Sequence, residues 1–140
     1  MKILAYILIA LLLGFAIGYR TRCRLVEDVG WSTFNSNKWK PIEQVIDSDN
    51  NRKKMVFDLV NNVLKNGIFD TGKRTTIKET IELLGVEKIK EADNGYLMTY
   101  EVEEKFGWNI DPEGGTKLFL WFDRDSLFAD WRIEEFWHEP

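Results

Sequence analysis

The sequence contains a single cysteine, Cys23, and a single histidine, His138. Sites built from several cysteine or histidine side chains are therefore not expected. One cysteine excludes an internal disulfide framework. The histidine lies beside Glu134, Glu135 and Glu139, but this cluster is at the C-terminal end of the chain, where chains fray. A metal site needs several ligands held on a rigid element. We therefore predict no metal site and no cofactor.

Catalytic motifs are also lacking. The chain has no glycine-rich phosphate loop, no Ser/His/Asp set and no metal-ligand spacing. A nucleophilic cysteine needs a base and a shaped pocket. Cys23 lies just after the apolar run and RTR (20–22), where the sequence offers neither. NIDPEGGTK (109–117) has too few oxygen ligands for a calcium loop and fits a hairpin turn better. We predict that the protein is not an enzyme.

Basic residues are scarce over most of the chain. The sequence has 19 Lys and Arg against 23 Asp and Glu, a net charge of −4. Four of the basic residues and none of the acidic ones lie in residues 1–24, so residues 25–140 hold 15 against 23, a formal charge of −8. Nucleic acid and anionic lipid both attract positive surfaces. We therefore expect no nucleic-acid partner for the folded part.

Residues 3–19 carry no charge, and three arginines follow between residues 20 and 24. This length is at the short limit for crossing a bilayer and is longer than the usual apolar core of a signal peptide. We predict a signal-anchor or transmembrane segment with a basic flank over residues 1–24. Cleavage after Gly18 is the alternative, because a small residue lies two positions before it. Lipidation of Cys23 is not expected, because it follows RTR rather than small residues.

A single domain is expected over residues 25–140. Residues 25–47 have no long periodic pattern and are predicted to form an extended arm with Trp31, Phe34 and Trp39 as anchors. A helix should follow from the cap residues at 47–49 to a glycine at position 67, because its apolar residues recur at spacings of three and four.

A second helix and three strands are predicted after it. Thr76 and Glu79 form a capping box, and Gly85 ends that helix. Residues 96–103 alternate between apolar and polar, residues 116–123 are apolar on both faces as in a strand covered on each side, and a last strand follows over 127–137. DPEGG (111–115) is predicted to be a turn. The expected fold is α+β, with an N-terminal membrane helix and two helices packed on a three-stranded antiparallel meander.

The order of these segments resembles a known family. RKKMVFDLV, ELLG, YLMTYEV and LFLWFD follow one another as in the BamE/OmlA-like (SmpA) small lipoprotein domain, over about residues 52–133. The matching positions are Leu84, Gly85, Tyr100, Leu118, Phe122 and Asp123. The resemblance implies a helix–helix–meander domain that is tethered to a membrane, non-enzymatic and an accessory partner of larger proteins. It favours an extracytoplasmic, periplasmic domain, whereas the positive-inside rule alone favours the cytoplasm.

These observations predict a membrane-tethered, non-catalytic protein-interaction domain of the cell envelope. Its partner would be another protein, and residues 3–19 would contact the membrane. The candidate partner-binding residues are acidic or aromatic residues of the first strand and its surroundings: Glu101, Glu103, Glu104, Trp108 and Trp131. An acidic run of this kind is otherwise the solvated face of a strand. The alternative function is an immunity or inhibitor protein whose negative charge blocks the basic active site of a toxin or hydrolase.

Overall fold

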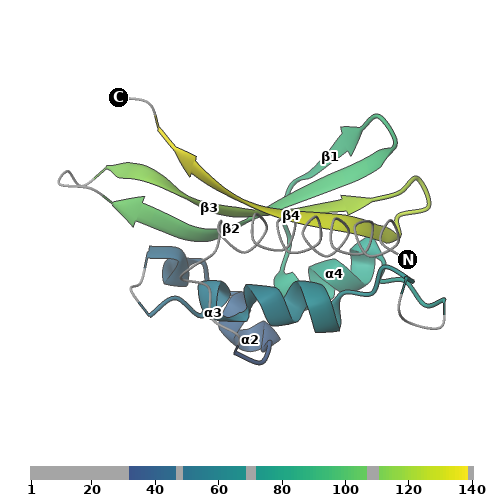
Figure 1. Ribbon diagram of the computed structural model, residues 1–140, viewed down its shortest axis with the longest axis horizontal. Helices are drawn as coiled ribbons and strands as arrows, with labels where there is room; N and C mark the ends of the chain where they lie inside the picture. Colours follow the sequence, from purple (N-terminus) through teal and green to yellow (C-terminus); the bar gives the residue numbers. More distant parts are fainter. Residues whose placement is uncertain (1–31, 47–48, 69–71, 107–110, 139–140) are drawn as a thin grey trace, which may run out of the picture.

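The computed structural model describes residues 32–46, 49–68, 72–106 and 111–138. The helical elements are α2 (Ser36–Trp39), the 3-10 helix η1 (Ile42–Ile46), α3 (Asn51–Asp58), its π-helical continuation η2 (Leu59–Val63) and α4 (Ile77–Leu84). The strands are β1 (Ile89–Ala92), β2 (Gly95–Phe106), β3 (Pro112–Phe122) and β4 (Phe128–Trp137). They form one antiparallel sheet in the order β1-β2-β3-β4, and the helices lie together on one side of it (Figure 1).

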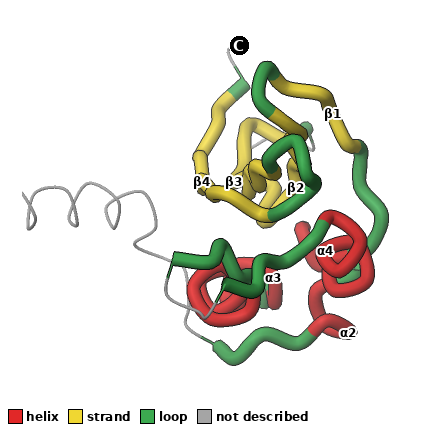
Figure 2. The backbone as a smooth tube through the Cα atoms, turned by 90° about the vertical axis from the view of Figure 1, so that its right-hand side faces the viewer, coloured by secondary structure: helices red, strands yellow, loops and turns green. Residues whose placement is uncertain are grey.

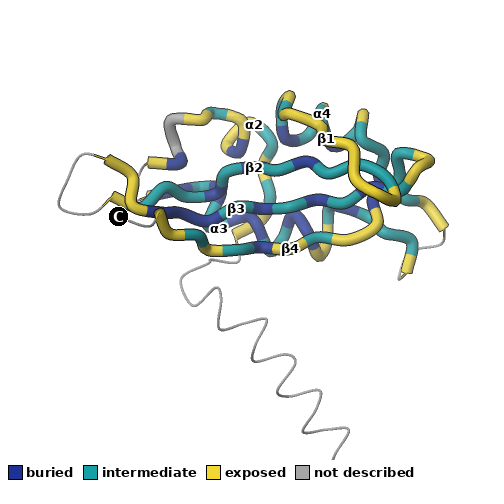
Figure 3. Tube along the Cα trace, turned by 90° about the horizontal axis from the view of Figure 1, so that it is seen from above, coloured by how far each residue is buried: buried dark blue, intermediate teal, exposed yellow. Residues whose placement is uncertain are grey.

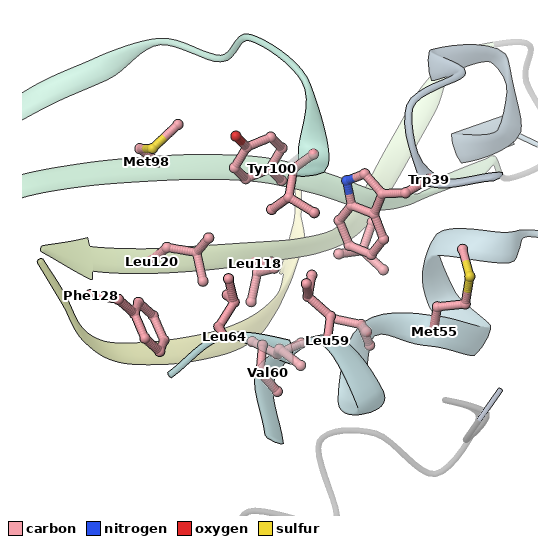
Figure 4. Close-up of a cluster of buried hydrophobic side chains, with 14 of the residues drawn as sticks. Trp39, Met55, Leu59, Val60, Leu64, Met98, Tyr100, Leu118, Leu120 and Phe128 are labelled. Atoms are coloured by element: carbon pink, nitrogen blue, oxygen red, sulfur yellow. The ribbon is translucent and has the colours of Figure 1, made fainter. Parts of the chain in front are cut away.

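The core fills the space between the helices and the sheet. Trp39, Leu59 and Leu64 come from the helical side, and Tyr100 and Leu118 meet them from β2 and β3 (Figure 4). All five side chains are buried. Burying large apolar side chains is the main favourable contribution to folding, so this layer holds the domain together.

The sheet has four strands, and the predicted three-stranded meander is wrong. All four residues of β1 are exposed, so the alternation that marks a half-buried strand is absent from its sequence. Ala92 pairs with Gly95, which leaves Asp93 and Asn94 as a two-residue hairpin loop. Asp and Asn favour tight turns, so the turn was the available signal for β1.

The extended arm predicted over residues 25–47 contains two short helical elements, α2 and η1. The Asn35 side chain caps α2 by accepting a hydrogen bond from the Lys38 N–H at 3.2 Å. Trp39, at the end of α2, is completely buried against the core. A helix of four residues is too short to show a periodic pattern, so only its aromatic anchor was visible in the sequence.

The predicted membrane anchor is a further correction. No helix among the described residues is long and apolar enough to cross a membrane. This finding contradicts the prediction of a single-pass signal-anchor and of a membrane localisation. Residues 3–19 and the cleavage position after Gly18 lie outside the described residues.

The caps of the two longer helices show where the sequence was informative. Thr76 Oγ1 accepts a hydrogen bond from the Glu79 N–H at 3.1 Å, and Glu79 Oε2 accepts one from the Thr76 N–H at 2.9 Å, so the predicted capping box is confirmed. Gly85 ends α4 as predicted. The cap of α3 is Asn50 rather than a residue of the cluster at 47–49, because the Asn50 side chain accepts the Lys53 N–H.

Two glycines predicted to lie in a turn belong instead to the middle of the sheet. Gly114 and Gly115 are buried in β3. A Cβ on Gly115 would lie 2.3 Å from the carbonyl oxygen of Glu103, and a Cβ on Gly114 would lie 2.3 Å from that of Phe136. These glycines therefore allow the neighbouring strands to approach closely, which is a second use of glycine besides turns.

Candidate functional site

The helices cover one face of the sheet, and no described element covers the other. Successive strand residues point to opposite faces. Leu118 and Leu120 of β3 are buried against the helices, so the residues between and after them point away. Figure 3 looks onto this second face, and no described helix crosses in front of β3 and β4 there. We call it the outer face, and it includes Lys90, Leu97, Thr99, Glu101, Glu104, Lys117, Phe119, Trp121, Asp130, Arg132, Glu134 and Phe136.

Three aromatic side chains follow one another across the outer face of β3 and β4. The rings of Phe119 and Trp121 are stacked, with centroids 6.0 Å apart and an angle of 27° between their planes. The ring of Phe136 lies over Gly115, and Lys117 Nζ is 4.2 Å from the centroid of that ring. We call Phe119, Trp121 and Phe136 the aromatic row. They are half-buried by their neighbours in the sheet although no described helix packs on them.

Charged side chains cross the middle of the outer face. Glu101, Lys117 and Glu134 lie opposite one another on β2, β3 and β4, so unlike charges are adjacent. Arg132 forms an ion pair with Glu134. Glu104 lies further along β2, opposite a glycine. Asp130 lies opposite Trp121, and Lys90 lies opposite Leu97. The outer face therefore combines the aromatic row with four acidic and three basic side chains.

The predicted partner-binding residues are divided between the two faces. Glu101 and Glu104 lie on the outer face. Glu103 faces the helices, and Trp131 lies opposite Leu120 and packs against the core. Trp108 lies outside the described residues. The structure therefore brings two of the five together.

A β-bulge is the reason why Glu103 changes side. The register between β2 and β3 shifts between Glu101 and Glu103, which leaves Val102 as the extra residue. Glu103 then points toward α3, where Lys53 Nζ lies 3.0 Å from its Oε1. Simple alternation along β2 could not predict this, because a bulge inverts the pattern after it.

The sequence prediction did not include the aromatic row. Residues 118–122 are apolar at every position, and the segment 116–123 was therefore expected to be a strand covered on both faces. The structure covers only the face that carries Leu118 and Leu120. An apolar residue on a binding surface and an apolar residue in the core give the same sequence pattern. Periodicity alone therefore cannot distinguish a binding surface from a buried one.

A buried arginine holds the helical layer against β2, directly behind the outer face. Arg52 is 5% exposed, and its Nε donates to the carbonyl oxygen of Trp39 at 2.7 Å while Nη1 donates to that of Glu101 at 2.6 Å. Its guanidinium also lies 5.4 Å from the centroid of the Trp39 ring. Removal from water lowers the pKa of Arg52 below its ordinary value. Arg52 thereby joins α2, α3 and β2.

The turn between β3 and β4 is fixed by a second arginine. Arg74 Nη1 lies 2.5 Å from Asp123 Oδ2, and Asp123 Oδ1 accepts the N–H groups of Asp125 and Leu127, each at 3.0 Å. The Leu127 N–H first, and then Arg74, hold the pKa of the Asp123 carboxyl below its usual value. The pair of strands that carries the aromatic row is therefore held at the turn that joins them.

Two open grooves on the described surface lie away from the outer face. An open groove of about 620 Å³ lies between α4 and the first hairpin, with Ile77, Ile81, Ile89 and Tyr96 in its lining. Small-molecule sites combine apolar walls with a few convergent polar groups. Thr76, one of the polar residues in its lining, already uses its side chain in the helix cap. Among the described residues, no group of three or more His, Cys, Asp and Glu could hold a metal ion.

Comparison with known proteins adds no assignment to this description. No family model, curated protein or solved structure matches the chain. The outer face is therefore identified from its geometry alone, and the resemblance to the BamE/OmlA-like domain stays a prediction.

Proposed function

We propose that this chain is a non-catalytic protein-binding domain whose binding surface is the outer face of the sheet. The observation that carries the proposal is the aromatic row on a sheet face without a described helix over it. Aromatic side chains provide the largest apolar area per residue and are enriched in the centres of protein interfaces. Contiguous apolar surface rimmed by polar groups marks interaction sites.

The charges on this surface define the class of partner. Its four acidic side chains, Glu101, Glu104, Asp130 and Glu134, outnumber its three basic ones, Lys90, Lys117 and Arg132. The formal charge of −8 over residues 25–140 also disfavours nucleic acid, which needs a positive surface. The partner that fits is a protein with an apolar centre for the aromatic row and basic residues at its margin.

The alternative function, an inhibitor that blocks a basic active site with acidic side chains, has less support. Such an inhibitor needs its carboxylates on one surface. Glu103 is paired with Lys53 on the side of the helices, away from Glu101 and Glu104. The acidic run of β2 is therefore divided between two faces, whereas Phe119, Trp121 and Phe136 all lie on the outer face.

Photo-cross-linking in the source cells tests the proposal. A photoreactive phenylalanine at position 117, in the full chain, is expected to give an adduct of one discrete mass that contains a second protein. The matched control is the same substitution at Lys38, which is exposed on α2, on the other side of the sheet. Urea unfolding of each variant shows that both are folded.

The mass of the adduct decides between the outcomes. A protein different from this chain, cross-linked from position 117 and not from position 38, supports the proposal. An adduct from position 38 alone, an adduct of two copies of this chain alone, or no adduct from position 117 contradicts it.

A further inference from the structure

An apolar groove lies between α4 and the first hairpin of the sheet. Ile77 and Ile81 line it from α4, and Ile89 of β1 and Tyr96 of β2 line it from the hairpin. The groove is open, with a volume of about 620 Å³. Ile89 is 41% exposed although it is a large apolar residue. Contiguous exposed apolar surface of this kind marks interaction sites.

The strand beside this groove is an edge strand of the sheet. β1 is at one end of the strand order, and β2 is its only partner among the described strands. Figure 2 shows β1 at the edge of the sheet, on the same side of the molecule as α4. An edge strand carries backbone donors and acceptors that can pair with a further strand. Backbone polar groups therefore follow one margin of the apolar groove.

The hairpin turn shows which backbone groups of β1 point outward. Ala92 pairs with Gly95 across a two-residue loop, and the residues that close such a loop exchange hydrogen bonds with each other. Successive residues of a strand alternate in this respect, so the backbone groups of Lys90 also point toward β2. The N–H and C=O groups of Ile89 and Glu91 therefore point away from β2, at the edge of the sheet.

The side chains of β1 alternate between the two faces of the sheet. Ile89 lies opposite Met98, which is buried against the helices, so Ile89 is on the helical side as well. Glu91 lies opposite Tyr96 on the same side, and Lys90, between them, is on the outer face. A strand added at this edge would show the same alternation. Its residue opposite Ile89 would direct its side chain toward the groove.

We propose that an extended segment of another protein adds to β1 as a fifth, antiparallel strand and places an apolar side chain in the groove between α4 and β1. In this mode of recognition the main-chain hydrogen bonds give affinity, and the pockets for alternate side chains give specificity. β1 has four residues, so the paired stretch is short. The proposal adds a second binding surface and does not depend on the outer face.

The charges of β1 define the chemistry of this segment. Lys90 and Glu91 are adjacent, and neither forms an ion pair within the described part of the chain. Unlike charges directly opposite each other stabilise a pair of strands, and like charges destabilise it. The segment therefore has an acidic residue opposite Lys90, a basic residue opposite Glu91 and an apolar residue opposite Ile89. Because the strands are antiparallel, the segment reads basic, acidic, apolar from its N-terminal end.

The same charges disfavour a second copy of this chain as the occupant. Two copies of β1 that pair antiparallel have a residue at the two-fold axis, because only residues of the same hydrogen-bonding orientation lie opposite each other. With Lys90 or Glu91 at the axis, that residue lies opposite itself. With Ile89 at the axis, Lys88 lies opposite Lys90. Each of these registers places like charges opposite each other, so the segment belongs to a different protein.

A synthetic peptide with this pattern tests the proposal. The probe is Thr-Thr-Arg-Glu-Ile-Thr-Thr with a fluorescent label, whose Arg, Glu and Ile would lie opposite Glu91, Lys90 and Ile89. Fluorescence anisotropy measures its binding to the full chain. The control peptide has Arg and Glu exchanged, which places like charges opposite each other at both positions. It is expected to bind at least about tenfold more weakly than the probe.

Methylation of single peptide nitrogens separates strand addition from other modes of binding. The N–H of the peptide Ile would point toward β1, whereas the N–H of the peptide Glu would point away from it. Methylation of the Ile nitrogen is therefore expected to weaken binding at least about tenfold, and methylation of the Glu nitrogen to change it by less than about twofold. A peptide bound as a helix, or held by its apolar side chain alone, would not distinguish the two nitrogens in this way.

Two substitutions in the chain test the groove itself. Ile89→Thr keeps a β-branched residue in the strand but removes apolar surface from the groove, so the probe is expected to bind at least about fivefold more weakly. The matched control is Val86→Thr, because Val86 is 86% exposed before β1 and does not line the groove. It is expected to leave binding unchanged. Urea unfolding shows that both variants are folded.

The outcomes that overturn the proposal are specific to this surface. They are a probe that does not bind at about 1 mM, exchanged charges without effect, equal effects of the two methylations, or equal binding to Ile89→Thr and Val86→Thr. Cross-linking from position 117 reports on the outer face, so the proposed function and this inference can fail separately.

Discussion

Replacing Arg52 by alanine is expected to lower the free energy of unfolding by about 4 kcal/mol. The guanidinium is 5% exposed and donates to the carbonyl oxygens of Trp39 and Glu101. Without it, these acceptors lose their donor in a site that water does not reach freely, and each buried polar group left unpaired is unfavourable by about 1–3 kcal/mol. The contact between Arg52 and the Trp39 ring is lost as well.

Two further variants separate the buried arginine from an ordinary loss of charge. Arg52→Lys keeps the charge but not the planar fork, so it should recover part of the stability only. Lys54 lies on the same helix as Arg52 and forms an exposed ion pair with Asp49, before the helix cap, so Lys54→Ala should change the free energy of unfolding by less than about 1 kcal/mol. Urea unfolding of the full chain measures all three. An Arg52→Ala variant as stable as Lys54→Ala would contradict the role given to Arg52.

Gly115→Ala is expected to destabilise the protein by about 3 kcal/mol, because a methyl group has no room between β3 and β2. Its Cβ would lie 2.3 Å from the Glu103 carbonyl oxygen and 3.0 Å from two ring atoms of Phe136. Backbone atoms on the neighbouring strand cannot move aside as a flexible side chain can. β3 is a central strand, so it cannot separate from one neighbour without disturbing the other.

The control for this substitution is Gly72→Ala. Gly72 has a φ of +83°, but a Cβ there would meet no atom within 4 Å. This variant therefore measures the unfavourable backbone conformation alone, about 1–2 kcal/mol. Thermal unfolding compares the two, and Gly115→Ala should have the lower midpoint. The reverse order would show that the strands can separate to accept the methyl group.

Local signals with a defined geometry were the part of the fold that could be predicted. The capping box of Thr76 and Glu79 specifies its own hydrogen bonds, so it located the start of α4. The alternation around Met98 and Tyr100 located the buried face of β2, because its period of two matches the pleat. These patterns depend on neighbours in the sequence alone.

Features that depend on distant residues could not be predicted. Gly115 looks like a turn residue until Glu103 and Phe136 are placed beside it. Phe119 looks like a core residue until the helices are seen to cover only the other face of β3. In both cases one residue type serves two purposes, and the choice between them depends on long-range packing.

The free energy of unfolding of the double variant Phe119→Thr/Trp121→Thr tests most directly whether the outer face is reserved for binding. Threonine suits a solvated strand face, so only the stacking of two half-buried rings is lost. The account predicts a loss of about 1 kcal/mol for the pair, against about 3 kcal/mol for the single core variant Leu120→Ala. A double variant that loses as much as Leu120→Ala would show that these rings belong to the core and would contradict the account.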